Sequence, residues 1–183
     1  MHKPHFFSKI TLKKLCFLSL MTAITAILSI YCTFRIGNAI KIPFKFVSVF
    51  LTAAMYGPFW GGTIAVLGDI LNVFFAPSGP WIPMITAIEF LNGAVFGIFF
   101  YKRYHEAKNY FFRTLICCLI LLLFDMILTS AVLTYVGYFP TFAAAFSLRL
   151  PAGIIKIFIQ GIFIIISKEY LKRFKLIGGK DFE

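Results

Sequence analysis

Long apolar segments dominate the sequence, and most of the basic residues stand in short clusters at the ends of these segments. A run of about 20 apolar residues is long enough to cross the hydrocarbon core of a bilayer as a helix. Of the 183 residues, 60% are hydrophobic and only 14% are charged, whereas soluble domains carry roughly 25% charged residues. The sequence therefore predicts an all-α integral membrane protein in which residues 1–183 form one compact transmembrane domain.

The apolar segments divide into six expected helices that form one bundle. The second is short and is separated from the third by Gly57-Pro58, and the turn at residues 77–80 ends the third because its two prolines and its glycine cannot continue a helix. The first segment resembles a signal peptide but lacks a small-x-small cleavage site, so we expect it to be retained. The expected helices span about 12–34, 46–56, 59–76, 82–101, 110–136 and 141–170.

Basic residues gather in three segments that an even number of helices places on the same side of the membrane. The positive-inside rule makes this side, and with it both termini, cytoplasmic. The formal charge of +11 arises mainly from these clusters, which argues against a nucleic-acid-binding surface. The opposite side carries no acid and only Arg35, Lys41 and Lys45, all in the connection after the first helix, so it would attract an anion.

Three acids and a guanidinium lie inside the expected helices, where ionisable residues are costly and usually mark a functional site. At about 1.5 Å per residue from the outer ends of their helices, Asp69 and Glu89 lie roughly 10 Å deep and Arg149 roughly 12 Å. Asn72 and Asn92 stand one turn from Asp69 and Glu89 on the same helical faces. The five residues predict a polar layer that a ligand reaches from outside, although a set of interhelical hydrogen bonds would also use such residues.

Asp125 and Lys156 are expected deeper, at roughly 17 and 22 Å. We interpret them as a structural ion pair. Above them, aromatic residues that include Phe34 and Trp81 are expected near the polar layer. An aromatic wall with acids at one end and a basic rim suits a flat heterocycle with an anionic tail, whose carboxylates Arg35 or Lys41 would hold.

The first helix carries pairs of small residues at a spacing of four, which allow close approach of another helix. Ser19 pairs with Ala23, and Thr22 pairs with Ala26. Most such faces pack inside a bundle, but this one could receive a partner subunit.

Sequence signatures of catalysis are missing. The chain has no GxxxxGK[ST], HExxH or GxSxG motif, its three histidines fall in cytoplasmic segments, and its four cysteines have no CxxC spacing. We therefore expect no enzymatic activity, no cofactor and no metal site.

The segments YGPFWGG, GDIL and FLNGAVFGIFFY, supported by SLRLPAGIIK in the last helix, resemble the substrate-binding S components of energy-coupling factor (ECF) vitamin transporters, and among them the folate family. The resemblance covers nearly the whole chain. It implies a high-affinity binding subunit for uptake of folate in a prokaryotic plasma membrane. It also implies two kinds of partner, a transmembrane coupling protein (T component) that contacts the small residues of the first helix and two cytoplasmic ATPases. The loop at residues 35–45 is similar to the family's gating loop.

Three other interpretations remain open. The chain could be an S component for another vitamin or a pterin-like heterocycle. It could be a self-sufficient secondary transporter in which Asp69, Glu89 or Asp125 relays protons, although it shows no inverted repeat. It could also be a membrane scaffold whose polar layer only packs helices.

Overall fold

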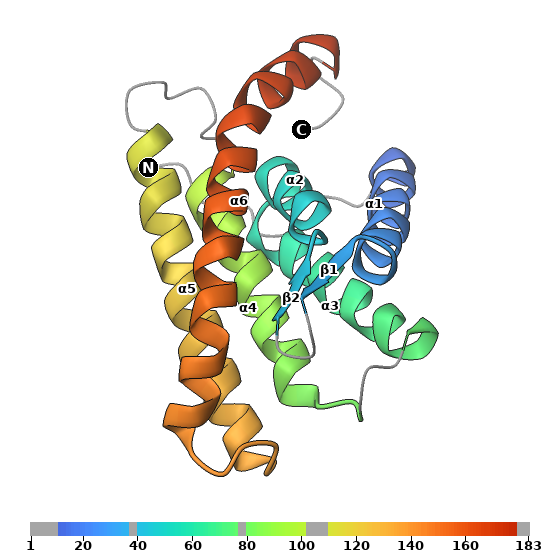
Figure 1. Cartoon of the computed structure of the whole chain (residues 1–183). Helices are drawn as coiled ribbons and strands as arrows, with labels where there is room; N and C mark the ends of the chain where they lie inside the picture. The colour runs from blue at the N-terminus through green and yellow to red at the C-terminus, as the bar shows by residue number, and fades with distance from the viewer. Residues whose placement is uncertain (1–10, 37–39, 77–79, 102–109, 179–183) are drawn as a thin grey trace, which may run out of the picture.

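The computed structural model of the chain describes residues 11–36, 40–76, 80–101 and 110–178, with only the backbone described at 34–36, 40–43 and 170–178. These residues form six helices and one two-stranded hairpin (Figure 1). Their bounds are α1 Leu12–Ile30, β1 Thr33–Ile36, β2 Ile40–Pro43, α2 Phe46–Tyr56, α3 Pro58–Phe75, α4 Pro83–Phe100, α5 Tyr110–Tyr135 and α6 Phe142–Gly178. All of these helices except α2 are long and apolar enough to cross a membrane, so the expected helical membrane class is confirmed.

The hairpin was not expected from the sequence. The first helix ends at Ile30 rather than at Phe34, and the chain continues as two antiparallel strands in which Arg35 pairs in register with Lys41. Both strands contain β-branched residues, which favour extended backbone over helix. Strand β2 packs against α6 and β1 against α1, so the hairpin links the two sides of the bundle, as Figure 1 shows.

The core of the bundle is built around the short helix α2, which contacts α1, α3, α4 and α6. The side chain of Phe50 is fully buried and meets the rings of Phe96, Phe100 and Phe163 edge to face, with centroids 5.3 to 6.4 Å apart. Aromatic pairs favour this geometry because the positive ring edge approaches a negative ring face. An apolar helix of only 11 residues is thus stabilised by burial on every side rather than by spanning the bilayer.

Two glycines allow α2, α3 and α4 to pack closely. Gly57 joins α2 to α3 with φ at 98°, in the left-handed region that residues with a Cβ rarely adopt. A Cβ on Gly97 of α4 would lie 2.3 Å from the Cα of Pro58 at the start of α3. Because backbone atoms cannot move away cheaply, this contact requires glycine.

One end of the bundle gathers the elements that form the candidate site. Helices α1, α3 and α5 finish towards this end and α4 and α6 start there, while the hairpin lies between α1 and α6, near the middle of Figure 1. Many large apolar side chains on the outside of the bundle are exposed, among them Leu119 of α5 and Phe158 and Ile162 of α6. Exposed apolar residues on spanning helices are suited to contact with lipid.

Candidate ligand-binding site

A cavity of about 530 Å³ lies between the hairpin end of α1, α3, α4, α5 and α6. Binding sites for small molecules commonly enclose about 300–1,000 Å³, so the space fits a vitamin-sized ligand. Its walls are mainly apolar, with a limited number of polar and charged groups. These groups are Ser29, Thr33, Lys45, Asn72, Glu89, Asp125, Thr129, Tyr138, Arg149 and Lys156.

Lys45 forms a buried ion pair at the wall of this cavity. Its Nζ lies 2.9 Å from Glu89 Oε1 and 3.6 Å from Asp69 Oδ1, and its side chain is only 10% exposed. Lys45 lies two residues after the end of β2 and directly before the first residue of α2. The ammonium group therefore links the base of the hairpin to α3 and α4.

A line of hydrogen bonds continues from Asp69 towards the end of the bundle. The hydroxyl of Thr86 donates to Asp69 Oδ2 at 2.8 Å, and the indole N–H of Trp81 donates to Thr86 Oγ1 at 3.0 Å. Asp69 thus accepts a hydrogen bond from Thr86 and faces the Lys45 ammonium. These contacts fix the start of α4 relative to α3.

A second charged cluster occupies the α5–α6 side of the cavity. Lys156 Nζ lies 2.9 Å from Asp125 Oδ2, Arg149 Nη2 lies 3.6 Å from Asp125 Oδ1, and the Thr129 hydroxyl donates to the same oxygen at 3.2 Å. The Nε of Arg149 is buried and has no hydrogen-bond partner among the described residues. Because Arg149 lines the cavity and its side chain is 24% exposed, other N–H groups of its guanidinium can donate to a group that enters the cavity.

The two clusters have opposite net charges. Lys45 with Asp69 and Glu89 combines one positive and two negative charges, whereas Asp125 with Arg149 and Lys156 combines one negative and two positive charges. The cavity as a whole is balanced, but its α3–α4 side has an excess negative charge and its α5–α6 side an excess positive charge. This arrangement suits a ligand with hydrogen-bond donors at one end and an anionic group at the other.

The residues predicted from the sequence fall into four groups. Asn72, Glu89 and Arg149 line the main cavity together. Asp69 and Trp81 are not among the described residues that line it, and they support Lys45 and Thr86 instead. Asn92 lines a smaller adjoining space. Phe34 and Arg35 belong to β1, at positions where only the backbone is described.

The structure corrects two details of the sequence interpretation. Lys45 was assigned to the basic outer rim with Arg35 and Lys41, but it is buried and paired because it follows a hairpin that returns the chain into the bundle. The expected Asp125–Lys156 ion pair is confirmed. However, the pair is not separate from the polar layer that includes Arg149, because the Arg149 guanidinium contacts the same Asp125 carboxylate.

The small residues of α1 divide between an inner and an outer face. Thr25 is fully buried, its hydroxyl lies 2.7 Å from that of Ser48, and its side chain fills the space beside Gly68. Ser19 and Ala23 are exposed on the outside of the bundle, whereas Thr22 and Ala26 are partly exposed. One face of α1 is thus used for internal packing, while the predicted partner face remains accessible.

Comparison with known proteins gives this architecture a family. Residues 9–172 match the family described as "ECF-type riboflavin transporter, S component". The chain belongs to this S-component family. The resemblance to ECF transporter S components is therefore confirmed. The expected place of the chain in a membrane is confirmed as well, and it agrees with the five spanning-length helices among the described residues.

Individual relatives carry the name of another vitamin. A folate transporter, FolT, of Clostridium novyi (strain NT) is 30% identical over 70 residues, a match that spans 38% of this chain and only 41% of that protein. A FolT of Leuconostoc mesenteroides subsp. mesenteroides is 23% identical over 159 residues, with 84% of this chain and 83% of that protein covered.

Two solved structures have similar folds. A crystal structure of FolT bound with folic acid has a TM-score of 0.71 and 26% identity, and the match covers 88% of this chain and 93% of the other. A structure of the S component of a bacterial ECF transporter has a TM-score of 0.70, with coverage of 88% and 96%. Its 24% identity supports the fold alone.

Proposed function

We propose that the chain is the membrane-embedded binding subunit for uptake of folate or a closely related vitamin. The observation that carries this proposal is the cavity of about 530 Å³ with charge of opposite sign on its two sides. Membership of the S-component family and similarity to FolT proteins support the same conclusion.

The chemistry of folate matches the distribution of charge. An amino-substituted pterin ring offers N–H donors that a carboxylate such as Glu89 accepts, and the glutamate tail offers carboxylates that a guanidinium binds. Arg149 is the best-placed cation, because it lines the cavity and lies 3.6 Å from Asp125, whereas Lys156 is paired with the same carboxylate at 2.9 Å. Asn72, Glu89 and Arg149 are accordingly proposed ligand contacts. Asp69 and Trp81 are proposed to hold Lys45 and the start of α4 in place.

The chain has no nucleotide-binding motif of the P-loop type. ATP-driven transport by this chain would therefore require partners that bind the nucleotide. We propose that a T component and two cytoplasmic ATPases supply energy, and that the T component docks on the outer face of α1. Ser19 and Ala23 on that face allow another helix to approach closely. Positive-inside charge placement supports cytoplasmic termini.

A reconstitution experiment tests this proposal. The purified chain is placed in liposomes with or without an ECF module, and uptake of labelled folate is measured with ATP inside. We expect uptake only when the module and ATP are both present. Uptake by the chain alone on an ion gradient would instead identify a secondary transporter, and absence of both uptake and binding would leave a scaffold role.

Riboflavin is the second candidate ligand, because the matching family is described by that vitamin. Riboflavin is uncharged, so it would leave the excess positive charge of Arg149 and Lys156 without a counterion from the ligand. Mass spectrometry of the compound that copurifies with the protein distinguishes the two vitamins. A reduced folate identified in the same way would settle the oxidation state.

A further inference from the structure

Lys45 stands where three helices of the candidate site meet. It directly precedes α2, whereas its partners Asp69 and Glu89 belong to α3 and α4. The first turn of α2 fixes its backbone, because the Ser48 hydroxyl donates to the Lys45 carbonyl at 3.1 Å and the Val49 N–H donates to it at 3.3 Å. The ammonium group therefore extends from a fixed point of the core towards α3 and α4.

Asp69 supports this ammonium on the side away from the main cavity. Its Oδ1 lies 3.6 Å from Lys45 Nζ, and its Oδ2 accepts the hydrogen bond from Thr86. Lys45 and Glu89 line both the main cavity and the smaller adjoining space, whereas Asp69 is not among the described residues that line either of them. Thr86 and Glu89 share a face of α4, three residues apart. The contacts thus form a closed path from α4 through α3 to Lys45 and back to α4.

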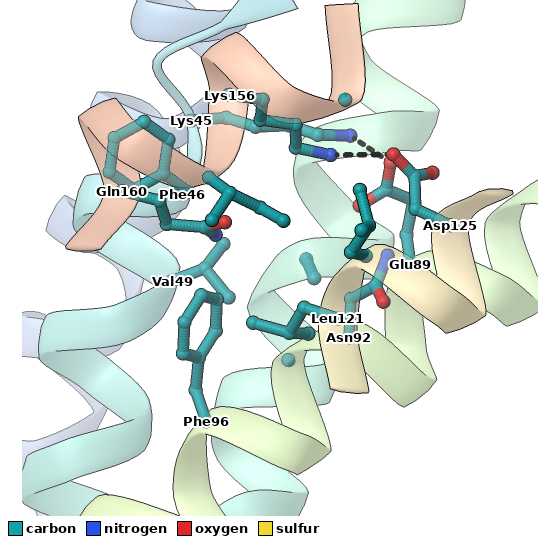
Figure 2. A pocket seen from close by; sticks show the side chains of 15 residues that line it. Lys45, Phe46, Val49, Glu89, Asn92, Phe96, Leu121, Asp125, Lys156 and Gln160 are labelled. Atoms are coloured by element: carbon teal, nitrogen blue, oxygen red, sulfur yellow. Dashed lines mark hydrogen bonds and ion pairs between the residues drawn. The ribbon is translucent and has the colours of Figure 1, made fainter. Parts of the chain in front are cut away.

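The Glu89 carboxylate has few other ways to keep its charge. Its side chain is only 22% exposed, and an ionised carboxylate away from water is costly unless it is paired. Figure 2 shows the charged ends of Lys45, Glu89, Asp125 and Lys156 gathered at one side of the smaller adjoining space, with Phe96 farther from them. The ammonium at 2.9 Å stabilises the negative charge of Glu89 and fixes the direction of its carboxylate.

A carboxylate paired in this way can still bind a ligand. An ionised carboxylate has two oxygens with about four lone-pair sites, and the 2.9 Å contact of Lys45 is to Oε1. Paired N–H donors bind most strongly to a carboxylate that is ionised and already oriented. Lys45 therefore contributes to affinity by preparing Glu89 before the ligand arrives, which lowers the cost of ordering the site on binding.

We infer that Lys45 is a positioning residue for the ligand: its ammonium, supported by Asp69, holds Glu89 ionised and oriented to accept N–H donors of the ligand's ring. This inference rests on the proposed function, in which Glu89 is a ligand contact. It adds that the residue in front of α2 determines how well the ring is bound, although Lys45 itself does not have to touch the ligand.

Equilibrium binding to the purified full chain tests this role in a double-mutant cycle. The probes are folate and N-(4-aminobenzoyl)-glutamate, which has the tail but lacks the pterin ring. We expect Lys45→Met to bind folate at least about tenfold more weakly, since a disordered Glu89 loses charge-assisted hydrogen bonds to the ring, and to bind the aminobenzoyl compound within about twofold of wild type. Lys45→Met/Glu89→Gln should bind folate within about twofold of Glu89→Gln alone, because Lys45 acts through Glu89.

Three further variants separate positioning from a general structural effect. Lys45→Arg keeps the positive charge and should bind folate within about threefold of wild type. Lys45→Gln keeps an N–H donor but no charge, so it should show the ring-specific loss of Lys45→Met, and it replaces that variant if methionine prevents folding. Lys14→Met removes another buried lysine, which lines neither space, and should bind both probes normally.

The outcomes separate this inference from the proposed function. If wild-type protein binds folate and Lys45→Met binds it equally or more tightly, the ammonium has no part in binding or competes for Glu89, so the positioning role is overturned while the proposed function stands. Equal weakening of both probes, a further loss of folate affinity in the double variant, or equal losses in Lys45→Arg and Lys45→Met would overturn it as well, because distortion of the site would then be the cause.

Riboflavin is tested on the same variants. If wild-type protein binds riboflavin instead of folate, the proposed folate binding is refuted, and the same double-mutant cycle with riboflavin decides the role of Lys45. A wild-type protein that binds neither vitamin overturns both proposals.

Discussion

Replacing Lys45 by methionine should destabilise the protein, because it removes the cation that Glu89 and Asp69 share. Glu89 and Asp69 are only 22% and 14% exposed in their side chains, so water replaces the lost ammonium poorly. A hydrogen bond to a charged group contributes about 1.5–3 kcal/mol, and breaking a buried ion pair costs about 3–5 kcal/mol. With the partial exposure of the carboxylates taken into account, Lys45→Met should cost about 3 kcal/mol.

Thermal unfolding in detergent measures this loss. At about 2–4 °C per kcal/mol for a chain of this size, Lys45→Met should lower Tm by about 6–12 °C. Glu89→Gln alone should lower it less, because Lys45 keeps Asp69. The double variant Lys45→Met/Glu89→Gln should lose less than the sum of the single losses, since it removes both members of the 2.9 Å pair.

Lys14 provides the matched control, because it is also a buried lysine. It packs over the rings of Tyr56 and Trp60 at the other end of the bundle and lines neither the main cavity nor the smaller adjoining space. Lys14→Met and Glu89→Gln should therefore be additive. Additive Tm losses for Lys45→Met and Glu89→Gln would refute the argument that this ion pair stabilises the site.

Three further results are expected. Gly97→Ala should lower Tm by several degrees, because a Cβ 2.3 Å from Pro58 Cα would overpack the α3–α4 contact at a cost of about 1–3 kcal/mol. In the control Gly161→Ala the atom nearest to the new Cβ lies at 3.9 Å, so its Tm should stay within about 1 °C of the wild-type value. Equal Tm values for the two variants would contradict this argument. Asp125→Asn should lower the Tm of the ligand-free protein, because it removes the carboxylate that Arg149 and Lys156 contact. It should strengthen folate binding, because the ligand's carboxylate no longer competes with Asp125 for these two cations. Weaker folate binding would argue against a tail site beside Arg149 and Lys156. Ligand binding should change the fluorescence of the Trp60→Phe variant, which keeps Trp81, because Trp81 adjoins the cavity-lining residues Pro80 and Ile82. It should not change the fluorescence of Trp81→Phe. A ligand-induced change that persists in Trp81→Phe would place the ligand elsewhere.

The helices could be predicted from the sequence because a bilayer requires long apolar segments with satisfied backbone hydrogen bonds. Gly57 and the proline-rich turn at residues 77–80 indicated where helices end, because glycine and proline interrupt helices through their own backbone geometry. The hairpin could not be predicted in this way, since Thr33–Ile36 and Ile40–Pro43 are short and gain their stability from α6 and α1 rather than from their own sequence.

Most polar residues of the site could be identified from the sequence, but their ion-pair partners could not. Counting residues along straight helices gave similar depths for Glu89 and Arg149, and both do line one cavity. The count could not show that Arg149 contacts Asp125, because the two residues lie on different helices, α6 and α5, and a count along each helix says nothing about how the two pack together. Lys45 was misplaced because it shares the connection after the first helix with two other basic residues, Arg35 and Lys41.

Equilibrium binding of folate to the purified wild-type chain and to Arg149→Gln tests the central claim most directly. Arg113→Gln serves as the control, because Arg113 of α5 lines neither space. The account predicts saturable folate binding to wild type and Arg113→Gln, and binding at least about tenfold weaker to Arg149→Gln, with riboflavin bound weakly by all three. Tight riboflavin binding with no saturable binding of folate or a reduced folate to the wild-type protein would contradict it.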